Sequence, residues 1–434
     1  MPWSIAGLII VLLFSLPSTS VAQRVAGRFS TSVYTFERFD TVNSSRIIAR
    51  AYQSMQLTVS EGSISFNSSL YGVTNISQSF GNDAAIRVSN LFLEWKDSAG
   101  SADVRIGRFP VFAGVGNGSV DGASVKFNHS GITILGYGGE NVRPDLRSTG
   151  FADLNENFFL GGQIIAALPE DIRVSVSYAN RHIQRDEYSA LRSDSLFNPV
   201  VLQIVPDSRA DQAFGVDTRY DGEALKVHGR YDYDLNFKRS RRGELGGRMT
   251  ANEHVTFTGD FVYREPLIPF NSMFGFFPVS SIREYEGGIE YTPFPDFFTY
   301  GRFAFVDYRD DRSRRISLGM YFNYGSLGFS GTDGYAGQLS SIDGQAAYPF
   351  LDRRLIPTLG FSFSAYRLDE SSPREDIFAG TLGAVVRPFQ WLSGDFQIQW
   401  LRNKVMDHDV RLYAKLNYWF SRDLKLFDRE EAHE

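Results

Sequence analysis

Charged side chains that alternate with apolar ones are the strongest candidates for a functional surface in this chain. In the segment 225–233, apolar residues and glycine alternate with four polar residues, Lys226, His228, Arg230 and Asp232. Successive side chains of an extended strand point to opposite sides, so these four groups would share one face. A face of this kind suits a wet wall, such as that of a water-filled channel.

Patterns for catalysis or metal binding are weak. The chain has 6 His and 0 Cys, which excludes thiol catalysis, disulfides and cysteine-ligated metals. His129-Ser130-Gly131 sets a base beside a nucleophile, but it lies in a predicted turn, and neighbouring strand residues face opposite ways. His182 and Asp186 fall in a loop, where a solvated histidine is the simpler interpretation. With no metal-ligand spacing or phosphate loop either, we expect no enzyme activity, no metal site and no cofactor.

The composition suits strands with one apolar face and one wet face. Aromatic residues make up 15% of the 434 residues and Gly contributes 40, yet the mean hydropathy is -0.21. After the first segment, no stretch approaches the roughly 20 apolar residues that a spanning helix needs. The net charge is -6, and no basic run exceeds Arg239–Arg242, so we expect no nucleic-acid partner.

Period-two alternation recurs along the chain, while helical periodicity is nearly absent. The segments in which it is clearest are 55–59, 225–233, 255–263, 316–322, 396–400 and 410–420. They are joined by links of two alternating kinds. The short links are predicted at 128–131, 168–171, 220–223, 251–253, 293–296, 323–326, 350–354 and 388–391, and the links between them are mostly longer and more polar. Short turns at one end and longer loops at the other are typical of an outer-membrane barrel.

The sequence therefore predicts an all-β fold, a single transmembrane antiparallel up-and-down β-barrel with short periplasmic turns and longer extracellular loops. The alternation gives about 22 strands, with both termini at the short-turn end; 18 or 20 strands fit nearly as well. A soluble barrel is the rival fold, but about 20 strands would enclose an interior too wide for side chains to fill. In lipid, a closed barrel pairs every backbone group. Aromatic residues at strand ends fit interfacial girdles.

The two chain ends are predicted to lie outside the barrel. Residues 5–16 are an apolar run followed by Ser20-Val21-Ala22, the pattern of a cleaved secretory signal, so we assign 1–22 to a signal peptide. An N-terminal anchor is the alternative, although the run is short for a span. Residues 23–420 would form the barrel without a plug domain. Residues 421–434 would form a charged periplasmic tail.

In this architecture, the chain resembles the porin-like outer-membrane barrels of Gram-negative bacteria. Its last strand, 410–420, alternates and ends in the aromatic Phe420, as in that class, although fourteen residues follow here. The segment from Ile106-Gly107-Arg108-Phe109 to Asp121-Gly122 is similar to the Gly-Arg-aromatic strand end of several porin-like groups. The resemblance implies the fold and a place in the outer membrane; it names no solute.

A barrel without a plug should have a water-filled lumen lined by the polar faces of its strands. The predicted lining residues are Arg105, Asp217, Lys226, Arg230, Asp260, Glu284, Glu286, Arg302, Asp395, Arg411 and Lys415. Rings of charge can tune ion selectivity. Because both signs are present, the simpler expectation for each residue is pairing with charges on neighbouring strands.

The loop 182–210 is the predicted constriction, since long loops are often functional. A helical turn is expected around 186–196, before the apolar stretch 199–205. Folded inward, the loop would supply Arg185, Asp186, Glu187, Arg192 and Asp194 to the pore; folded outward, it would shield the surface.

The function expected is passive diffusion of small hydrophilic solutes through an outer-membrane porin-like channel. The alternative is a structural or assembly barrel whose loops or tail bind protein or polysaccharide. The expected partners are outer-membrane lipid, periplasmic chaperones and the barrel-assembly machinery during biogenesis, and the solutes themselves. The chain is compatible with either a monomer or a homo-oligomer.

Overall fold

The chain folds into a single closed barrel of antiparallel strands. The computed structural model describes residues 23–41, 44–77, 84–142, 154, 157–184, 187–193, 198–204, 211–266, 281–309, 311–335, 337–369 and 371–424. The signal peptide predicted at 1–22 and the end of the tail, 425–434, lie outside these residues. No helix among the described residues is long and apolar enough to cross a membrane.

Twenty-two strands form the barrel wall. The first half comprises β1 (Gln23–Thr41), β2 (Ser44–Glu61), β3 (Ile64–Asn75), β4 (Ala84–Lys96), β5 (Ala102–Ala113), β6 (Gly116–His129), β7 (Ile132–Asn141), β8 (Asn157–Leu168), β9 (Ile172–Ile183), β12 (Asp211–Asp221) and β13 (Leu225–Asp234). The second half comprises β14 (Arg239–Thr250), β15 (Val255–Arg264), β16 (Ile282–Phe294), β17 (Phe297–Asp307), β18 (Arg312–Phe322), β19 (Gly325–Gly334), β20 (Gly337–Ala347), β21 (Leu355–Arg367), β22 (Glu375–Phe389), β23 (Leu392–Arg402) and β24 (Asp409–Leu424). Two further strands, β10 (Tyr188–Ser193) and β11 (Pro199–Ile204), form a separate hairpin between β9 and β12.

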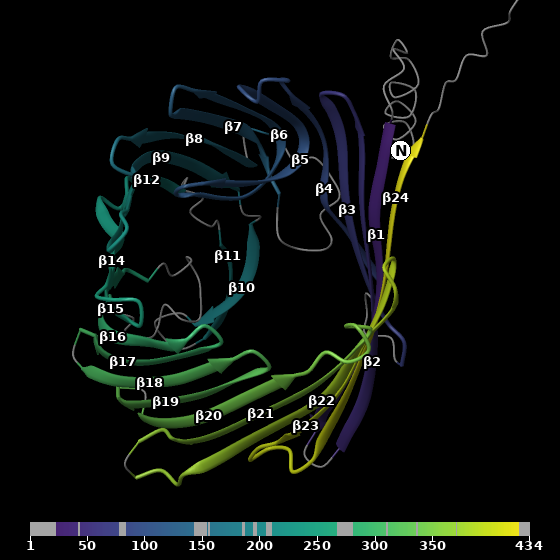
Figure 1. Cartoon of the computed structure of the whole chain (residues 1–434), viewed down its shortest axis with the longest axis vertical. Helices are drawn as coiled ribbons and strands as arrows, with labels where there is room; N and C mark the ends of the chain where they lie inside the picture. Colours follow the sequence, from purple (N-terminus) through teal and green to yellow (C-terminus); the bar gives the residue numbers. More distant parts are fainter. Residues whose placement is uncertain are drawn as a thin grey trace, which may run out of the picture.

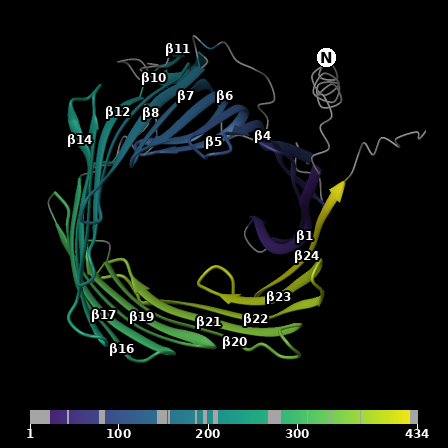
Figure 2. The ribbon, with the colours of Figure 1, turned by 45° about the horizontal axis from the view of Figure 1, so that its top comes forward.

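Each wall strand pairs with the next, and the first strand pairs with the last. The purple β1 and the yellow β24 lie side by side (Figure 1), and the strands make a complete ring when the molecule is tilted (Figure 2). Closure leaves no unpaired sheet edge, which is the condition for crossing hydrocarbon with strands. The prediction of an up-and-down barrel with about 22 strands is confirmed.

The strand order also confirms the two kinds of link. The predicted short turns all fall between paired strands, for example 130–131 between β6 and β7 and 323–324 between β18 and β19. Both the first and the last strand of the barrel have their terminal ends at this side, where Gln23 lies opposite Leu424. At the opposite end, the links range from the two residues between β5 and β6 to the long insertion between β9 and β12.

The outer face of the wall is apolar. Its large side chains stay exposed in the isolated chain; examples are Leu245, Ile289, Phe303, Leu318 and Leu382. Aromatic rings, exposed or half-buried, gather where strands meet the short turns, as in the contacts Phe294–Phe297, Tyr324–Tyr348, Phe389–Trp391 and Tyr418–Phe420. An apolar belt with aromatic ends matches the profile of a membrane barrel.

The last strand runs beyond the aromatic residue at which the barrel was expected to end. Ser421, Arg422 and Asp423 continue the ladder with β1 after Phe420. The reason is the length of β1, whose first residues would otherwise have unpaired backbone groups on this side. The first part of the charged tail is therefore strand.

Candidate functional site

The inner face of the barrel carries the charged residues. Directly opposed residues of neighbouring strands share a face, and the ladder sets Asp217 opposite Arg230, Asp260 opposite Glu286, and Asp395 opposite Lys415. The other predicted lining residues fall on the same face, opposite to the exposed apolar residues: Arg105, Lys226, Glu284, Arg302 and Arg411. The structure thus brings all eleven to one face of the wall. Their part in conduction stays a prediction.

Seven of the eleven form ion pairs, either within one strand or with a nearby strand. Arg302 lies 3.6 Å from Glu286 and 3.4 Å from Glu290, and Arg315 binds both Glu284 and Glu286. Glu284, Glu286, Arg302 and Arg315 line a recess of about 350 Å³ on the inner wall. A wall of paired charges is strongly hydrated but has little excess of either sign.

Similar pairs recur around the ring. Arg105 lies 2.8 Å from Glu94 and Arg411 lies 2.7 Å from Asp409. Arg230 binds Asp232 at 3.0 Å and faces Asp217 at 3.8 Å.

The loop predicted as the constriction has a different structure from the one expected. Instead of a helical turn, Tyr188–Ser193 is a strand that pairs with Pro199–Ile204. The prediction of a turn is wrong because apolar residues recur on both segments in cross-strand register, for example Leu191 opposite Val201. Both strands are largely exposed and pair with no wall strand.

Of the five residues that this loop was to supply, one has a described side chain. Glu187 accepts a hydrogen bond from Gln203, at 2.6 Å, within the loop itself. Arg185, Asp186 and Asp194 lie outside the described residues, and Arg192 is described only as part of the strand β10.

A different segment enters the barrel: the tip of the β5–β6 hairpin, residues 109–119, called here the hairpin tip. The pairing of β5 with β4 stops at Arg108, and that of β6 with β7 starts at Val120, so the hairpin tip pairs with neither neighbour except at its last residue, where the Ser119 carbonyl oxygen accepts from the Val142 amide at 3.0 Å. Gly107 makes the bend possible, because its φ is 125° and an added Cβ would lie 2.3 Å from the Leu91 carbonyl oxygen.

The hairpin tip packs on the inner wall through apolar side chains. Phe109, Val111 and Ala113 are buried, together with Tyr137 and Phe159 of the wall strands β7 and β8. The Tyr137 and Phe159 rings meet edge to face at 5.0 Å. This cluster lies inside a barrel whose inner wall is otherwise polar, and its burial holds the hairpin tip against the wall.

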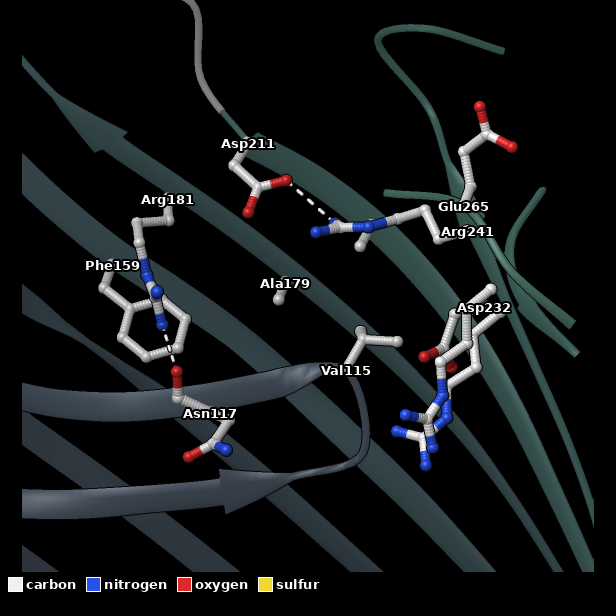
Figure 3. A pocket seen from close by; sticks show the side chains of 12 residues that line it. Val115, Asn117, Phe159, Ala179, Arg181, Asp211, Asp232, Arg241 and Glu265 are labelled. Carbon is white, nitrogen blue, oxygen red and sulfur yellow. Dashed lines mark hydrogen bonds and ion pairs between the residues drawn. The ribbon is translucent and has the colours of Figure 1, made fainter. Parts of the chain in front are cut away.

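Polar contacts fix the end of the hairpin tip. The Val115 amide donates to Ser177 Oγ at 3.1 Å, and Arg230 Nη2 donates to the Gly114 carbonyl oxygen at 3.3 Å. Arg181 donates to the Asn117 carbonyl oxygen. Figure 3 shows the β5–β6 hairpin in front of the wall, with Arg181 directed at Asn117.

The opposite side of the bend carries a second polar network. Arg108 binds both oxygens of Asp121, at 2.7 and 2.6 Å, and donates to the Val88 carbonyl oxygen. Next to it, the buried Asn157 donates to Glu140 at 3.3 Å. A bidentate pair ties the two strands of the hairpin together at the point where they leave the wall.

Sequence reasoning missed the hairpin tip, although a signal for it was present. The residues 107–122 contain Gly107, Gly114, Gly116, Gly118 and Gly122, a density that marks close backbone approach more than a regular strand. The sequence singles out this segment only through its similarity to a strand end found in other barrels.

Comparison with known proteins supports the fold. No family model matches the chain, and no curated protein matches it. Among solved structures, the ferric enterobactin receptor (PfeA) of Pseudomonas aeruginosa, in a mutant form, superposes with a TM-score of 0.58 at 8% identity, over 91% of this chain and 80% of the receptor.

Two further structures are similar. The PapC-PapD-PapK-PapG P pilus tip assembly intermediate of E. coli gives a TM-score of 0.52 at 8% identity, over 94% of this chain and 62% of the matched chain. OccK2 (OpdF) of Pseudomonas aeruginosa gives 0.42 at 9% identity, over 92% of this chain and 98% of that one, and carries no argument by itself. Likeness at these identities concerns the fold. The fold that these structures share with this chain is a closed antiparallel β-barrel.

Proposed function

We propose that the chain is an outer-membrane channel that lets small hydrophilic solutes diffuse through a lumen narrowed by the hairpin tip. The observation that carries this proposal is the hairpin tip itself, which leaves the wall at Gly107 and is held against the inner face by Arg181 and Arg230. A barrel that serves only as a scaffold has no need of a segment anchored inside its lumen.

Three features support the channel. The wall is closed and has 22 strands, and barrels of similar size leave an aqueous interior unless something fills it. The inner face is lined with ion pairs, which water stabilises. Of the described residues, the hairpin tip is the segment anchored by polar contacts to the inner wall, so it would reduce the open cross-section without closing it.

The export route is part of the proposal. Cleavage after Ala22 would leave Gln23, the first residue of β1, as the new N-terminus. The apolar outer face would then contact lipid, with the short turns in the periplasm.

Single-channel conductance in planar bilayers tests the proposal. The variant replaces residues 110–119 by Asn-Gly, a two-residue hairpin turn that suits the opposed pair Phe109 and Val120. We expect steady conductance steps from the refolded chain 23–434 and steps about twofold larger from the variant, because conductance follows the area of the narrowest section.

Equal steps from both proteins would show that the hairpin tip does not limit the pore. No steps from the correctly folded chain would reject the channel and favour the alternative, a structural or assembly barrel. Gel mobility of unheated against boiled protein serves as the control for folding.

A further inference from the structure

A cavity lies between the hairpin tip and the wall, and Arg181 in it forms no ion pair with a carboxylate of the described residues, although Asp211 lies opposite it in the ladder. We propose that this cavity binds a small organic monocarboxylate, with Arg181 as the group that recognises it. The inference rests on the proposed channel, since solutes would reach the cavity through the lumen, but the binding itself can be measured without conductance.

The cavity has a volume of about 460 Å³. Val115 and Asn117 of the hairpin tip form one side, and β8, β9, β12, β13, β14 and β15, with Glu265 directly after β15, supply the other residues (Figure 3). A space of this size holds a ligand of roughly ten non-hydrogen atoms together with water, at the lower end of the range for small-molecule sites.

Three of the four arginines that line the cavity form ion pairs with carboxylates. Arg241 lies 2.8 Å from Asp211. Arg242 and Arg264 both bind Glu244, at 2.6 and 3.4 Å. Two other carboxylates of the lining, those of Asp232 and Glu265, bind Arg230 and Arg239 outside it. Each of these groups is therefore already held in an ion pair, with Arg242 and Arg264 sharing one carboxylate.

Arg181 differs from them. Among the described residues, no carboxylate forms an ion pair with it; one terminal nitrogen donates to the Asn117 carbonyl oxygen. Its guanidinium carbon lies 4.2 Å from the centre of the Phe159 ring, which fixes the plane of the group. Its Nε is buried and has no hydrogen-bond partner. Donors of a flat, fixed guanidinium match the two oxygens of a carboxylate.

The rest of the lining selects among anions. Val115, Ala179 and Ala213 give the cavity an apolar side, which suits the hydrocarbon part of an organic acid. Asp211, Asp232 and Glu265 also line it, but each is held in an ion pair, so Arg181 is the one lining arginine without such a pair among the described residues and offers a single charge to a ligand. The combination favours a monocarboxylate over a phosphate or a dicarboxylate.

Isothermal titration calorimetry of the refolded chain 23–434 in detergent tests the site, with benzoate, benzamide and inorganic phosphate as probes. Benzamide has the shape of benzoate without its charge. We expect benzoate to bind at least about tenfold more tightly than benzamide or phosphate, since a charge-assisted bidentate pair is the main source of affinity.

Arg181→Gln should weaken benzoate binding at least about tenfold. The matched control is Arg219→Gln, because Arg219 is paired with Asp221 of its own strand, β12, outside the cavity; the affinity of this variant for benzoate should stay within about twofold of the parent. Arg181→Lys keeps the positive charge but removes the two parallel N–H donors of the guanidinium, so its affinity for benzoate should be intermediate. This variant also tests the site if Arg181→Gln fails to fold.

Equal binding of benzoate and benzamide, or unchanged benzoate binding in Arg181→Gln, would overturn the proposal. Conductance separates it from the channel: a protein that conducts without binding benzoate lacks the site and keeps its function. A protein that binds benzoate without conducting keeps the site and loses the proposed function.

Discussion

Gly107 has a backbone conformation that other residues rarely adopt, at the point where the hairpin leaves the wall. Its φ of 125° is outside the regions open to residues with a Cβ. The Leu91 carbonyl oxygen and the Phe92 Cα are also too close for a side chain. The inward course of the hairpin tip thus depends on this glycine, and the bidentate pair of Arg108 with Asp121 holds the bend from the other side.

Gly107→Val should destabilise the fold by at least about 1–3 kcal/mol, the range for a strained backbone conformation, with the steric overlap added. Gly259→Ala is the matched control, since Gly259 lies in a strand with open space around its Cβ position, and its effect should be small. Urea unfolding of the refolded chain in detergent measures both. Similar unfolding midpoints for the two variants would contradict the role given to Gly107.

Asp369 lies in the link between β21 and β22, outside the membrane-spanning strands. The Ser371 hydroxyl, followed by the Ser372 hydroxyl and the amides of both serines, donates to its carboxylate. These hydrogen bonds lower the pKa of Asp369 to about 2. Because the folded pKa is depressed, the turn has its full stabilisation above the ordinary aspartate pKa of about 3.9 and loses it as the pH falls through about 2.

A carboxyl-carbon NMR titration should give a midpoint near 2 for Asp369. Ser371→Ala should move the midpoint upward, toward the ordinary value, because the hydroxyl of Ser371 makes the largest contribution. A midpoint of about 3.9 in the parent protein would show that the turn is not formed in solution.

At the scale of elements, the sequence predicted strands well and loops poorly. Alternation such as that of 225–233 reports which face each residue occupies, because the period of a strand is fixed. Alternation does not show where a strand stops pairing with its neighbour, so the sequence predicts β5 and β6 as ordinary strands of the barrel wall. The loop 182–210 is the predicted constriction because of its length. Length does not show whether a loop folds into the barrel or away from it, and the described part of this loop is an exposed hairpin.

The cavity beneath the hairpin tip could not be predicted from the sequence either. Arg230 was singled out from its alternation with apolar residues, whereas Arg181 was not, since its neighbours do not show a clear pattern. Among the described residues, Arg181 forms no ion pair with a carboxylate, which follows from the three-dimensional packing between β6, β8 and β9, and no spacing in the sequence encodes it.

Removal of the β10–β11 hairpin should leave conductance unchanged, within about 10%, because these strands pair only with each other and are exposed. The variant deletes residues 189–203 and is compared in planar bilayers with the variant lacking the hairpin tip. A larger conductance step after this deletion would contradict this expectation and support the prediction that the loop 182–210 narrows the pore.

For the whole molecule, the contrast between lipid outside the barrel and water inside it explains the structure. Hydrogen bonds close the ring at the seam between Gln23 and Leu424, so no backbone edge meets lipid. Apolar residues then face outward and ion-paired residues face inward, in alternation along each strand. Fold and strand number could be predicted because this alternation is repeated in nearly every strand.

Neighbouring residues of β19 test that contrast directly. Phe329 is exposed on the outer face, and Ser330 lies on the inner face opposite Ser317 and Ser341. The chain has 0 Cys, so Phe329→Cys and Ser330→Cys each introduce a unique thiol.

The measurement is single-channel conductance before and after a membrane-impermeant, positively charged methanethiosulfonate reagent. The structure predicts a stepwise fall in conductance for Ser330→Cys and no change for Phe329→Cys, whose thiol faces lipid. Modification of Phe329→Cys alone, or an equal effect on both variants, would contradict a barrel with water inside and hydrocarbon outside.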